Sequence, residues 1–162
     1  MSYSNSIIFG PIPSRRFGIS LGVDLSPSKK QCNFDCLYCE LEGAKTVEKM
    51  DEFPSVQEII SAIKYSFLKH SKIDVITITC NGEPTLYPNL DELVDEINKI
   101  KNNTKTLILS NGSTIYKKNI FKTLLKIDTV KLSLDCVSKK CFKKLDRHNI
   151  SVETEKIVPA MC

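Results

Sequence analysis

The strongest constraint on the fold of this chain is an alternation of two hydrophobic patterns that begins after residue 50. Short runs rich in β-branched residues, which predict strands, alternate with longer stretches whose apolar positions recur at helical spacing. Strands that alternate with helices form parallel sheets, because each helix carries the chain back to the start of the next strand. The strands are predicted near residues 18–25, 73–80, 106–110 and 129–135. The predicted fold class is therefore α/β, with four βα units and a parallel sheet.

Local signals mark where the helices between these strands begin. Ser55 and Glu58 form a capping box, which predicts a helix from residue 56 onward. Asn89, with Glu92 three residues later, predicts the start of the next helix. Two further helices are predicted, at about residues 114–126 and from near Ser138 onward.

Four βα units are too few to close a barrel of parallel strands. The sheet is therefore expected to be an open arc whose last strand has an unpaired edge. Residues 151–162 show no fifth strand. We expect a single domain over residues 1–162 that corresponds to the first part of a larger architecture.

Composition excludes several other classes of protein. With 41% hydrophobic and 26% charged residues, the 162-residue chain is globular rather than disordered or collagen-like. No stretch approaches the roughly 20 apolar residues of a membrane-spanning helix, and the first ten residues do not resemble a secretory signal, so we expect a cytoplasmic protein with no membrane partner. The net charge of +4 implies no polyanionic partner, although the excess of Lys and Arg over residues 117–147 permits nucleic acid binding.

Three cysteines lie close together in the long segment between the first two predicted strands. Cys32, Cys36 and Cys39 are spaced four and three residues apart. Thiolates bind zinc or iron–sulfur clusters. A structural zinc site uses four protein ligands, whereas a [4Fe–4S] cluster held by three cysteines leaves one iron free for another molecule. The spacing also fits one face of a helix, on which the cysteines would be buried apolar groups.

The sequence Cys32-Asn-Phe-Asp-Cys36-Leu-Tyr-Cys39 resembles the cluster loop of the radical S-adenosylmethionine (SAM) superfamily, in which an aromatic residue precedes the third cysteine. The resemblance implies a partial TIM barrel of six βα units, of which the last strands are missing here. It also implies a [4Fe–4S] cluster at the three cysteines. In the superfamily the reduced cluster cleaves bound SAM to a 5′-deoxyadenosyl radical, which abstracts hydrogen from a substrate. An external flavodoxin- or ferredoxin-like protein would donate the electron.

The same resemblance implies SAM contacts at the ends of several predicted strands. Asn81, Gly82 and Glu83, followed by Pro84, resemble the Gly-Gly-Glu motif that receives the SAM amino group, with Asn81 in place of the first glycine. Hydroxyl, amide and carboxylate groups after the next two strands would contact the SAM carboxylate and ribose. The SAM-binding residues so implied are Tyr38, Asn81, Gly82, Glu83, Pro84, Ser110, Asn111, Ser133 and Asp135. Ordinary turns and a helix cap are the alternative, and no residue is predicted to be catalytic.

The segment Phe9–Asp24 resembles a group of radical SAM Fe–S oxidoreductases related to the enzymes that build the wyosine tricycle on guanosine in tRNA. That kinship makes a tRNA base one expected substrate. Arg15 and Arg16 would suit an anion such as a carboxylate or phosphate. Lys118, Lys122 and Lys126 are spaced to form a row along one face of a helix. This row is either a solvated outer face or a contact for RNA phosphates.

Two non-enzymatic interpretations stay open. One is a small zinc-binding interaction module, and the other is an Fe–S electron carrier that does not bind SAM. The remaining cysteines have no spacing that suits a second cluster, and they are predicted to be free thiols buried as small apolar groups because disulfides are rare in the cytosol. They are Cys80, Cys136, Cys141 and Cys162.

Overall fold

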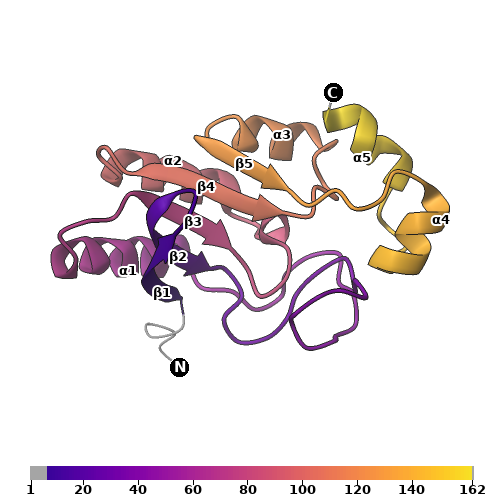
Figure 1. The fold of residues 1–162 in the computed structure, drawn as a ribbon, viewed down its shortest axis with the longest axis horizontal. Coiled ribbons are helices and arrows are strands. Elements are labelled where there is room, and N and C mark those ends of the chain that lie inside the picture. The colour runs from indigo at the N-terminus through magenta and orange to yellow at the C-terminus, as the bar shows by residue number, and fades with distance from the viewer. Residues whose placement is uncertain (1–6, 162) are drawn as a thin grey trace.

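The computed structural model describes residues 7–161 and shows one sheet with helices packed on one of its faces (Figure 1). The strands are β1 (Ile8–Ser14), β2 (Gly18–Asp24), β3 (Val75–Thr79), β4 (Lys105–Ser110) and β5 (Thr129–Leu132). The helices are α1 (Val56–Lys69), α2 (Leu90–Ile100), α3 (Lys118–Leu124), α4 (Lys139–Cys141) and α5 (Thr154–Met161), with two short helical turns, η1 (Pro84–Leu86) and η2 (Phe142–Asp146). No helix in this described part is long and apolar enough to cross a membrane.

The strand order is β1-β2-β3-β4-β5, and neighbours from β2 to β5 run parallel. This pairing confirms the predicted α/β fold, with four parallel strands in an open arc. Because right-handed crossovers return each strand in the same direction, the carboxyl ends of β2 to β5 share one edge of the sheet. The long cysteine-containing segment between β2 and α1, which we call the cysteine loop (residues 25–55), lies at this edge (Figure 1).

The sequence did not predict β1, which pairs with β2 in the antiparallel direction. Pro11 and Pro13 argue against a strand, since proline lacks the N–H group that a central strand must donate. At the edge of a sheet they are tolerated, because one side of the strand has no neighbour. The hairpin places Arg15 and Arg16 just before the start of β2, at the opposite end of this strand from the cysteine loop.

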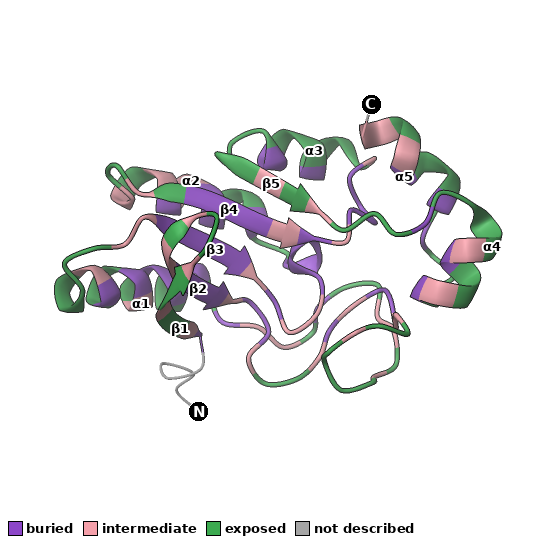
Figure 2. Cartoon of the chain, in the orientation of Figure 1, coloured by how far each residue is buried: buried purple, intermediate pink, exposed green. Residues whose placement is uncertain are grey.

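The hydrophobic core fills the space between the sheet and helices α1, α2 and α3. The side chains of Leu21, Ile76 and Ile108 on the strands, and of Ile63 and Ile97 on the helices, have no exposed surface. Each such burial stabilises the fold by about 1.5–3 kcal/mol. Figure 2 shows β3 and β4 largely buried and β5 mostly exposed or half-buried, as expected for the strand at the end of an open arc.

The predicted start of α1 is confirmed, and that of α2 only in position. The Ser55 hydroxyl accepts the Glu58 N–H at 3.3 Å, and the Glu58 carboxylate accepts the Ser55 N–H at 2.8 Å. Asn89 precedes α2, but its side chain makes no capping hydrogen bond. The backbone of Asn89 lies at φ −103° and ψ 29°, outside the extended conformation from which a capping side chain reaches the helix.

Two element boundaries also differ from the prediction. Helix α3 begins at Lys118 rather than near residue 114, because Ser113 and Thr114 hydrogen-bond to other parts of the chain instead of joining the helix. Strand β5 ends at Leu132 rather than at Asp135, so Asp135 lies in the segment that leads to α4.

The cysteines outside the cysteine loop divide into three cases. Cys80 is a buried free thiol, as predicted. Cys136 and Cys141 form a disulfide, so the prediction that they are free thiols is wrong. They lie five residues apart at the turn that begins α4, where local geometry alone brings their side chains together. Cys162 lies outside the described residues.

At the end of the sheet away from the cysteine loop, one carboxylate holds two neighbouring strands together. Asp128, just before β5, accepts the backbone N–H and the hydroxyl of Thr106, both at 2.9 Å, and an ammonium hydrogen of Lys101. The hydrogen bond from the Lys101 ammonium is the main reason that the pKa of Asp128 lies well below its usual range. Since Thr106 follows the first residue of β4, the carboxylate ties the starts of β4 and β5 together.

We therefore predict that Asp128→Asn lowers the free energy of unfolding by about 1–3 kcal/mol at pH 7. The matched control, Asp95→Asn, removes an exposed partner of Lys126 and should cost less than about 1 kcal/mol. Because the folded-state pKa of Asp128 is depressed, its contribution is complete above about pH 4 and is lost as the pH falls further. Urea unfolding should show the wild type and Asp128→Asn converging below about pH 4. A constant difference down to pH 2 would contradict this role.

Candidate functional site

The cysteine loop is fixed to the sheet by backbone pairing with the turn after β3. The Gln31 N–H donates to the Asn81 carbonyl at 2.8 Å, and the Glu83 N–H donates to the Gln31 carbonyl at 3.0 Å. The buried Gln31 side chain also donates to Ser26 Oγ and the Glu52 carbonyl, both at 2.6 Å. One residue before Cys32, the loop is therefore held on both its backbone and its side chain. No sequence pattern indicated this role of Gln31.

Gly82 is required by the close approach of the loop. Its φ is +140°, and a Cβ atom built on it would lie 1.9 Å from the Gln31 carbonyl oxygen. No side chain fits at that distance, and L-residues rarely adopt that φ. The glycine of the Asn81-Gly82-Glu83 motif is thus explained by the contact between the β3 turn and the cysteine loop.

Glu83 is a buried carboxylate that joins the ends of β3 and β4. It is 1% exposed. Its Oε1 accepts the N–H and hydroxyl of Thr85 at 3.0 and 2.6 Å and the hydroxyl of Ser110 at 2.7 Å. Its Oε2 accepts the Asn111 N–H at 2.7 Å. Burial raises the pKa of Glu83, and the hydrogen bonds oppose that rise. Four predicted site residues from two strand ends, Glu83, Pro84, Ser110 and Asn111, are brought together here.

The three cysteines of the loop are free and partly buried. Burial, followed by the charge of Glu83, raises the pKa of the Cys32 thiol to about 12. Burial also raises the pKa of Cys36 to about 11. Among residues 7–161 no group of three or more Cys, His, Asp or Glu side chains is arranged to hold a metal ion. In this arrangement the thiols of Cys32 and Cys36 are protonated, so binding a metal would release their protons.

Lys30 adds a positive charge to this region. Its side chain is 7% exposed, and its ammonium nitrogen lies 3.7 Å from Asp35 Oδ1. Among the described residues it has no hydrogen-bond partner. A buried ammonium without hydrogen bonds is costly unless negative charge faces it. Asp35 supplies part of this negative charge, and the ammonium hydrogens of Lys30 that lack an acceptor suit a further anionic group beside Cys32, a feature that the sequence pattern did not reveal.

The cysteine loop also contacts the segment that follows β5. The Leu37 N–H donates to the Leu145 carbonyl at 2.9 Å, and the Asp35 N–H donates to the Asp146 carbonyl at 3.0 Å. These two bonds flank Cys36. The side chain of Asp146 is buried, and burial raises its pKa. This segment had not been predicted to contact the cysteines, because its contacts depend on how the chain turns after β5.

Tyr38 and Asp135, two more predicted site residues, lie on this side of the loop, whereas Ser133 lies beside the end of β4. The Tyr38 hydroxyl is 2.7 Å from Asp135 Oδ2 and 3.1 Å from Asp146 Oδ1. Burial raises the pKa of Tyr38, and the hydrogen bond to Asp135 adds to the rise. Ser133 is exposed, and its backbone N–H donates to the Ser110 carbonyl at 2.9 Å. Tyr38 and Asp135 therefore contact each other rather than Glu83.

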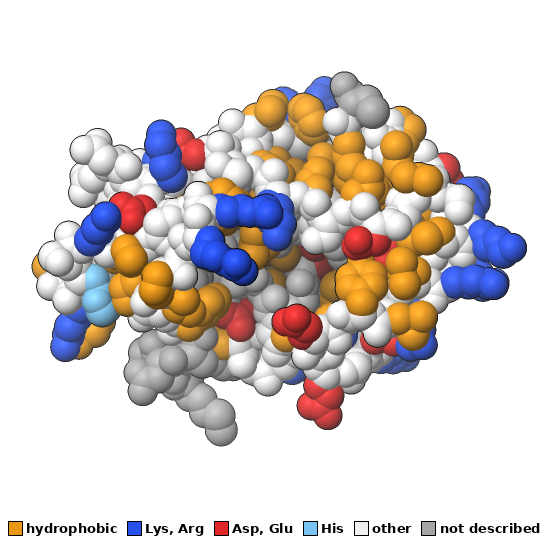
Figure 3. Space-filling model, viewed as in Figure 1, with side chains coloured by type: hydrophobic (Ala, Val, Ile, Leu, Met, Phe, Trp, Pro, Cys, Tyr) orange, Lys and Arg blue, Asp and Glu red, His pale blue; other side chains and the backbone are white. Residues whose placement is uncertain are grey.

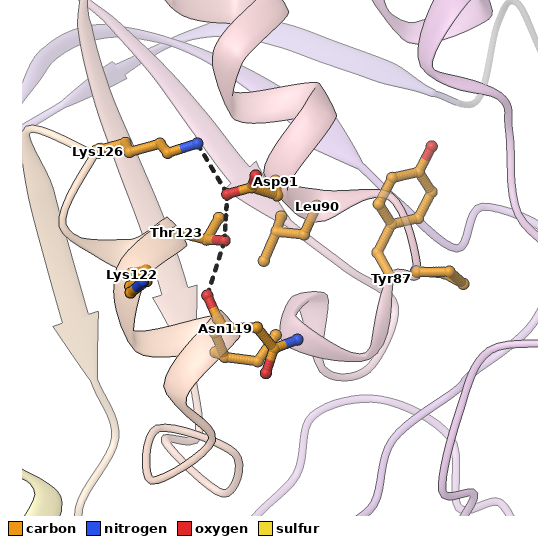
Figure 4. Close-up of a pocket in the computed structure, with 9 residues that line it drawn as sticks. Tyr87, Leu90, Asp91, Asn119, Lys122, Thr123 and Lys126 are labelled. Carbon is orange, nitrogen blue, oxygen red and sulfur yellow. Dashed lines mark hydrogen bonds and ion pairs between the residues drawn. The ribbon is translucent and has the colours of Figure 1, made fainter.

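The basic row on α3 lies apart from this site. A groove between the start of α2 and helix α3 is lined by Asp91, Lys122 and Lys126 among others (Figure 4). Asp91 accepts the Thr123 hydroxyl at 2.6 Å and forms an ion pair with Lys126 at 2.9 Å. Lys126 also pairs with Asp95 at 2.9 Å. Of the three lysines in this row, Lys126 is thus the one whose charge is paired among the described residues.

Residues 27–160 match the radical SAM superfamily, and the chain belongs to it. A UPF0026 protein of Helicobacter pylori is 53% identical over 142 residues, which cover 87% of this chain and 46% of the relative. A probable GTP 3′,8-cyclase of Methanococcus aeolicus is 33% identical over 146 residues, which cover 88% of this chain and 46% of the relative. The chain thus spans about half the length of these relatives.

A solved structure, TYW1 with a lysine-pyruvate adduct bound, matches with a TM-score of 0.55 at 19% sequence identity. The match covers 88% of this chain and 49% of that one. At this identity the likeness concerns the fold alone. It agrees with the expected radical SAM type of α/β sheet.

We predict that Gly82→Ala disrupts the contact between the β3 turn and the cysteine loop. The added Cβ collides with the Gln31 backbone at a φ that alanine avoids, so the free energy of unfolding should fall by about 2 kcal/mol or more. Gly43→Ala is the control, since its Cβ would meet only Asp35 Oδ1 at 3.9 Å, and its effect should stay within about 0.5 kcal/mol. Urea unfolding measures both. If the two variants were equally stable, Gly82 would not lie this close to the Gln31 backbone in the folded protein.

Proposed function

We propose that Cys32, Cys36 and Cys39 hold a [4Fe–4S] cluster and that the protein cleaves SAM reductively with it. The observation that carries the proposal is the position of three free thiols on a loop anchored at the carboxyl edge of a parallel sheet, in a chain of the radical SAM superfamily. When bound, the cluster supplies one electron that breaks the sulfonium–C5′ bond of SAM, giving methionine and a 5′-deoxyadenosyl radical.

The donor set of the cysteine loop, three free thiols, suits such a cluster. Three soft thiol ligands leave one iron open, whereas a closed zinc site needs a fourth ligand. The buried ammonium of Lys30, which has no hydrogen-bond partner among the described residues, would face the negative charge of the thiolates. Both features favour a cluster over the alternative of a zinc-binding module.

The SAM contacts expected from the resemblance are part of the proposal. Asn81 and Ser133 follow β3 and β5; Asn81 is half-buried and Ser133 exposed, so both have surface available to a ligand. Glu83 already accepts four hydrogen bonds, and its main effect is to shape this edge of the sheet. Tyr38 and Asp135, which are hydrogen-bonded to each other, would line the other side of the SAM site.

For the substrate we propose a guanosine nucleotide, free or within tRNA. The resemblance of Phe9–Asp24 to wyosine-type enzymes suggests a guanosine in tRNA, and one relative is named a probable GTP 3′,8-cyclase. Comparing 5′-deoxyadenosine formation with total tRNA, GTP and ATP tests this proposal. If neither tRNA nor GTP raises 5′-deoxyadenosine formation above the level with ATP or with no added substrate, the search turns to other metabolites.

The cluster would need an external electron donor, and we propose an acidic flavodoxin- or ferredoxin-like protein. The surface that would receive it, here called the α4 surface, consists of Leu37, Val137, Lys140, Lys143 and Lys144. Leu37 is 58% exposed and Val137 76% exposed, and the three lysines are exposed without an ion pair among the described residues. Figure 3 shows basic side chains gathered at the end of the molecule where Figure 1 places α4. Exposed aliphatic groups beside free cations suit a transient protein interface more than RNA, which is bound by stacking and phosphate contacts.

We predict that anaerobic reconstitution gives a brown protein with about four iron and four sulfide per chain. Cys32→Ala, Cys36→Ala and Cys39→Ala should each lose most of this iron. Cys80→Ala is the matched control, because Cys80 is a buried free thiol close to the loop, and it should keep the iron of the wild type. A colourless protein with one bound zinc would support the zinc module. A cluster that cycles without producing 5′-deoxyadenosine from SAM would support the electron carrier.

We also predict that changing Lys140, Lys143 and Lys144 to Glu slows reduction of the cluster by an acidic flavodoxin about tenfold or more at low salt. Changing Lys117, Lys118 and Lys122 on and before α3 alters the net charge equally and should have little effect. Reduction by dithionite, a small chemical reductant, should be the same in both variants. If both triple variants slow the flavodoxin reaction alike, overall charge rather than the α4 surface is responsible.

A further inference from the structure

Cys32 differs from the other cysteines of the loop in the N–H groups that point at its sulfur. The backbone N–H of Phe34 donates to Cys32 Sγ at 3.4 Å. The side-chain amide of Asn111, from the end of β4, donates to the same sulfur at 3.7 Å. The first is a local feature of the loop. The second joins the sulfur to a different part of the sheet.

The orientation of the Asn111 amide is fixed by its other partners. Its Oδ1 accepts the backbone N–H of Ser113 at 2.9 Å, which requires the oxygen on that side. Its Nδ2 also donates to Asn33 Oδ1 at 3.0 Å. The nitrogen, not the oxygen, therefore faces Cys32. The backbone N–H of Asn111 is in turn held by Glu83 at 2.7 Å, so the residue is anchored from both its backbone and its side chain.

Such a donor matters to a cluster because reduction adds negative charge that is shared with the ligand sulfurs. An N–H group directed at a sulfur stabilises the more negative, reduced state, and hydrogen bonds to sulfur are among the factors that set the potential of iron–sulfur clusters. A donor held in place by Glu83 and Ser113 needs no rearrangement when the electron arrives.

We propose that Asn111 is a positioning residue that raises the reduction potential of the cluster through its N–H···S bond to Cys32. The proposal rests on the proposed function, since it requires a cluster at Cys32. It differs from the expectation that Asn111 contacts SAM, because the side chain is directed at the sulfur and at Asn33. Through Asn111, the structure at the end of β4 thereby affects the reduction potential of the cluster.

The test is an anaerobic redox titration of the reconstituted protein, followed by electron paramagnetic resonance, with no SAM present. In Asn111→Ser the hydroxyl can still accept the Ser113 N–H but is too short to reach Cys32. At the midpoint potential of the wild type, the ratio of reduced to oxidised cluster should fall about threefold or more. Asn111→Asp keeps the shape and the acceptor but removes the N–H donor and adds negative charge, so its ratio should fall further. If one of these variants fails to load iron, the other carries the test.

Ser113→Ala is the matched control. It removes the hydroxyl that bonds to Asn33 but leaves the backbone N–H that orients Asn111, so its midpoint should match the wild type. An equal shift in Ser113→Ala and Asn111→Ser would overturn the proposal, because loosening of the turn would explain both. Unchanged midpoints with weaker SAM binding would also overturn it and make Asn111 a SAM contact. Failure of the wild type to load iron would instead refute the proposed function, and this inference with it.

Discussion

The backbone of Gln31 lies so close to Gly82 that no side chain fits between them, and the rest of the site depends on this contact. Through it, a loop of about thirty residues that contains no strand or helix is held against the turn after β3. A loop of this length would otherwise be free to adopt many conformations. Because Gln31 immediately precedes Cys32, the anchor also fixes where the first thiol lies relative to Glu83 and Asn111.

A network of buried polar groups surrounds this anchor. Glu83 accepts donors from the turn after β3 and from the end of β4, so a single carboxylate sets the spacing of the two strand ends. Lys30 brings a buried cation to the same region, while the thiols of Cys32 and Cys36 are held protonated by burial. Such a network is most stable when each charge is matched. Asp35 already pairs with Lys30, and a negatively charged group among the cysteines would add to this pairing.

Sequence patterns predicted the parts of the protein that depend on local periodicity and known motifs. The four parallel strands, the capping box at Ser55 and the position of the cysteines at the carboxyl edge follow from apolar spacing and chain order. Strand β1 was missed because its prolines argue against a strand except at an edge. The disulfide between Cys136 and Cys141 was missed because spacing alone does not show which thiols meet. The contacts of Gln31, Lys30 and Asp146 join segments far apart in sequence, and no local signal marks them.

The central claim is that three cysteines hold a cluster with one iron open to SAM. The most direct measurement is the electron paramagnetic resonance spectrum of the reduced, reconstituted protein before and after addition of SAM. If the open iron binds SAM, the signal of the reduced cluster should change shape on addition and should not change with S-adenosylhomocysteine to the same extent. A cluster signal that is identical with and without SAM, or a protein that takes up iron but gives no such signal, would contradict the claim.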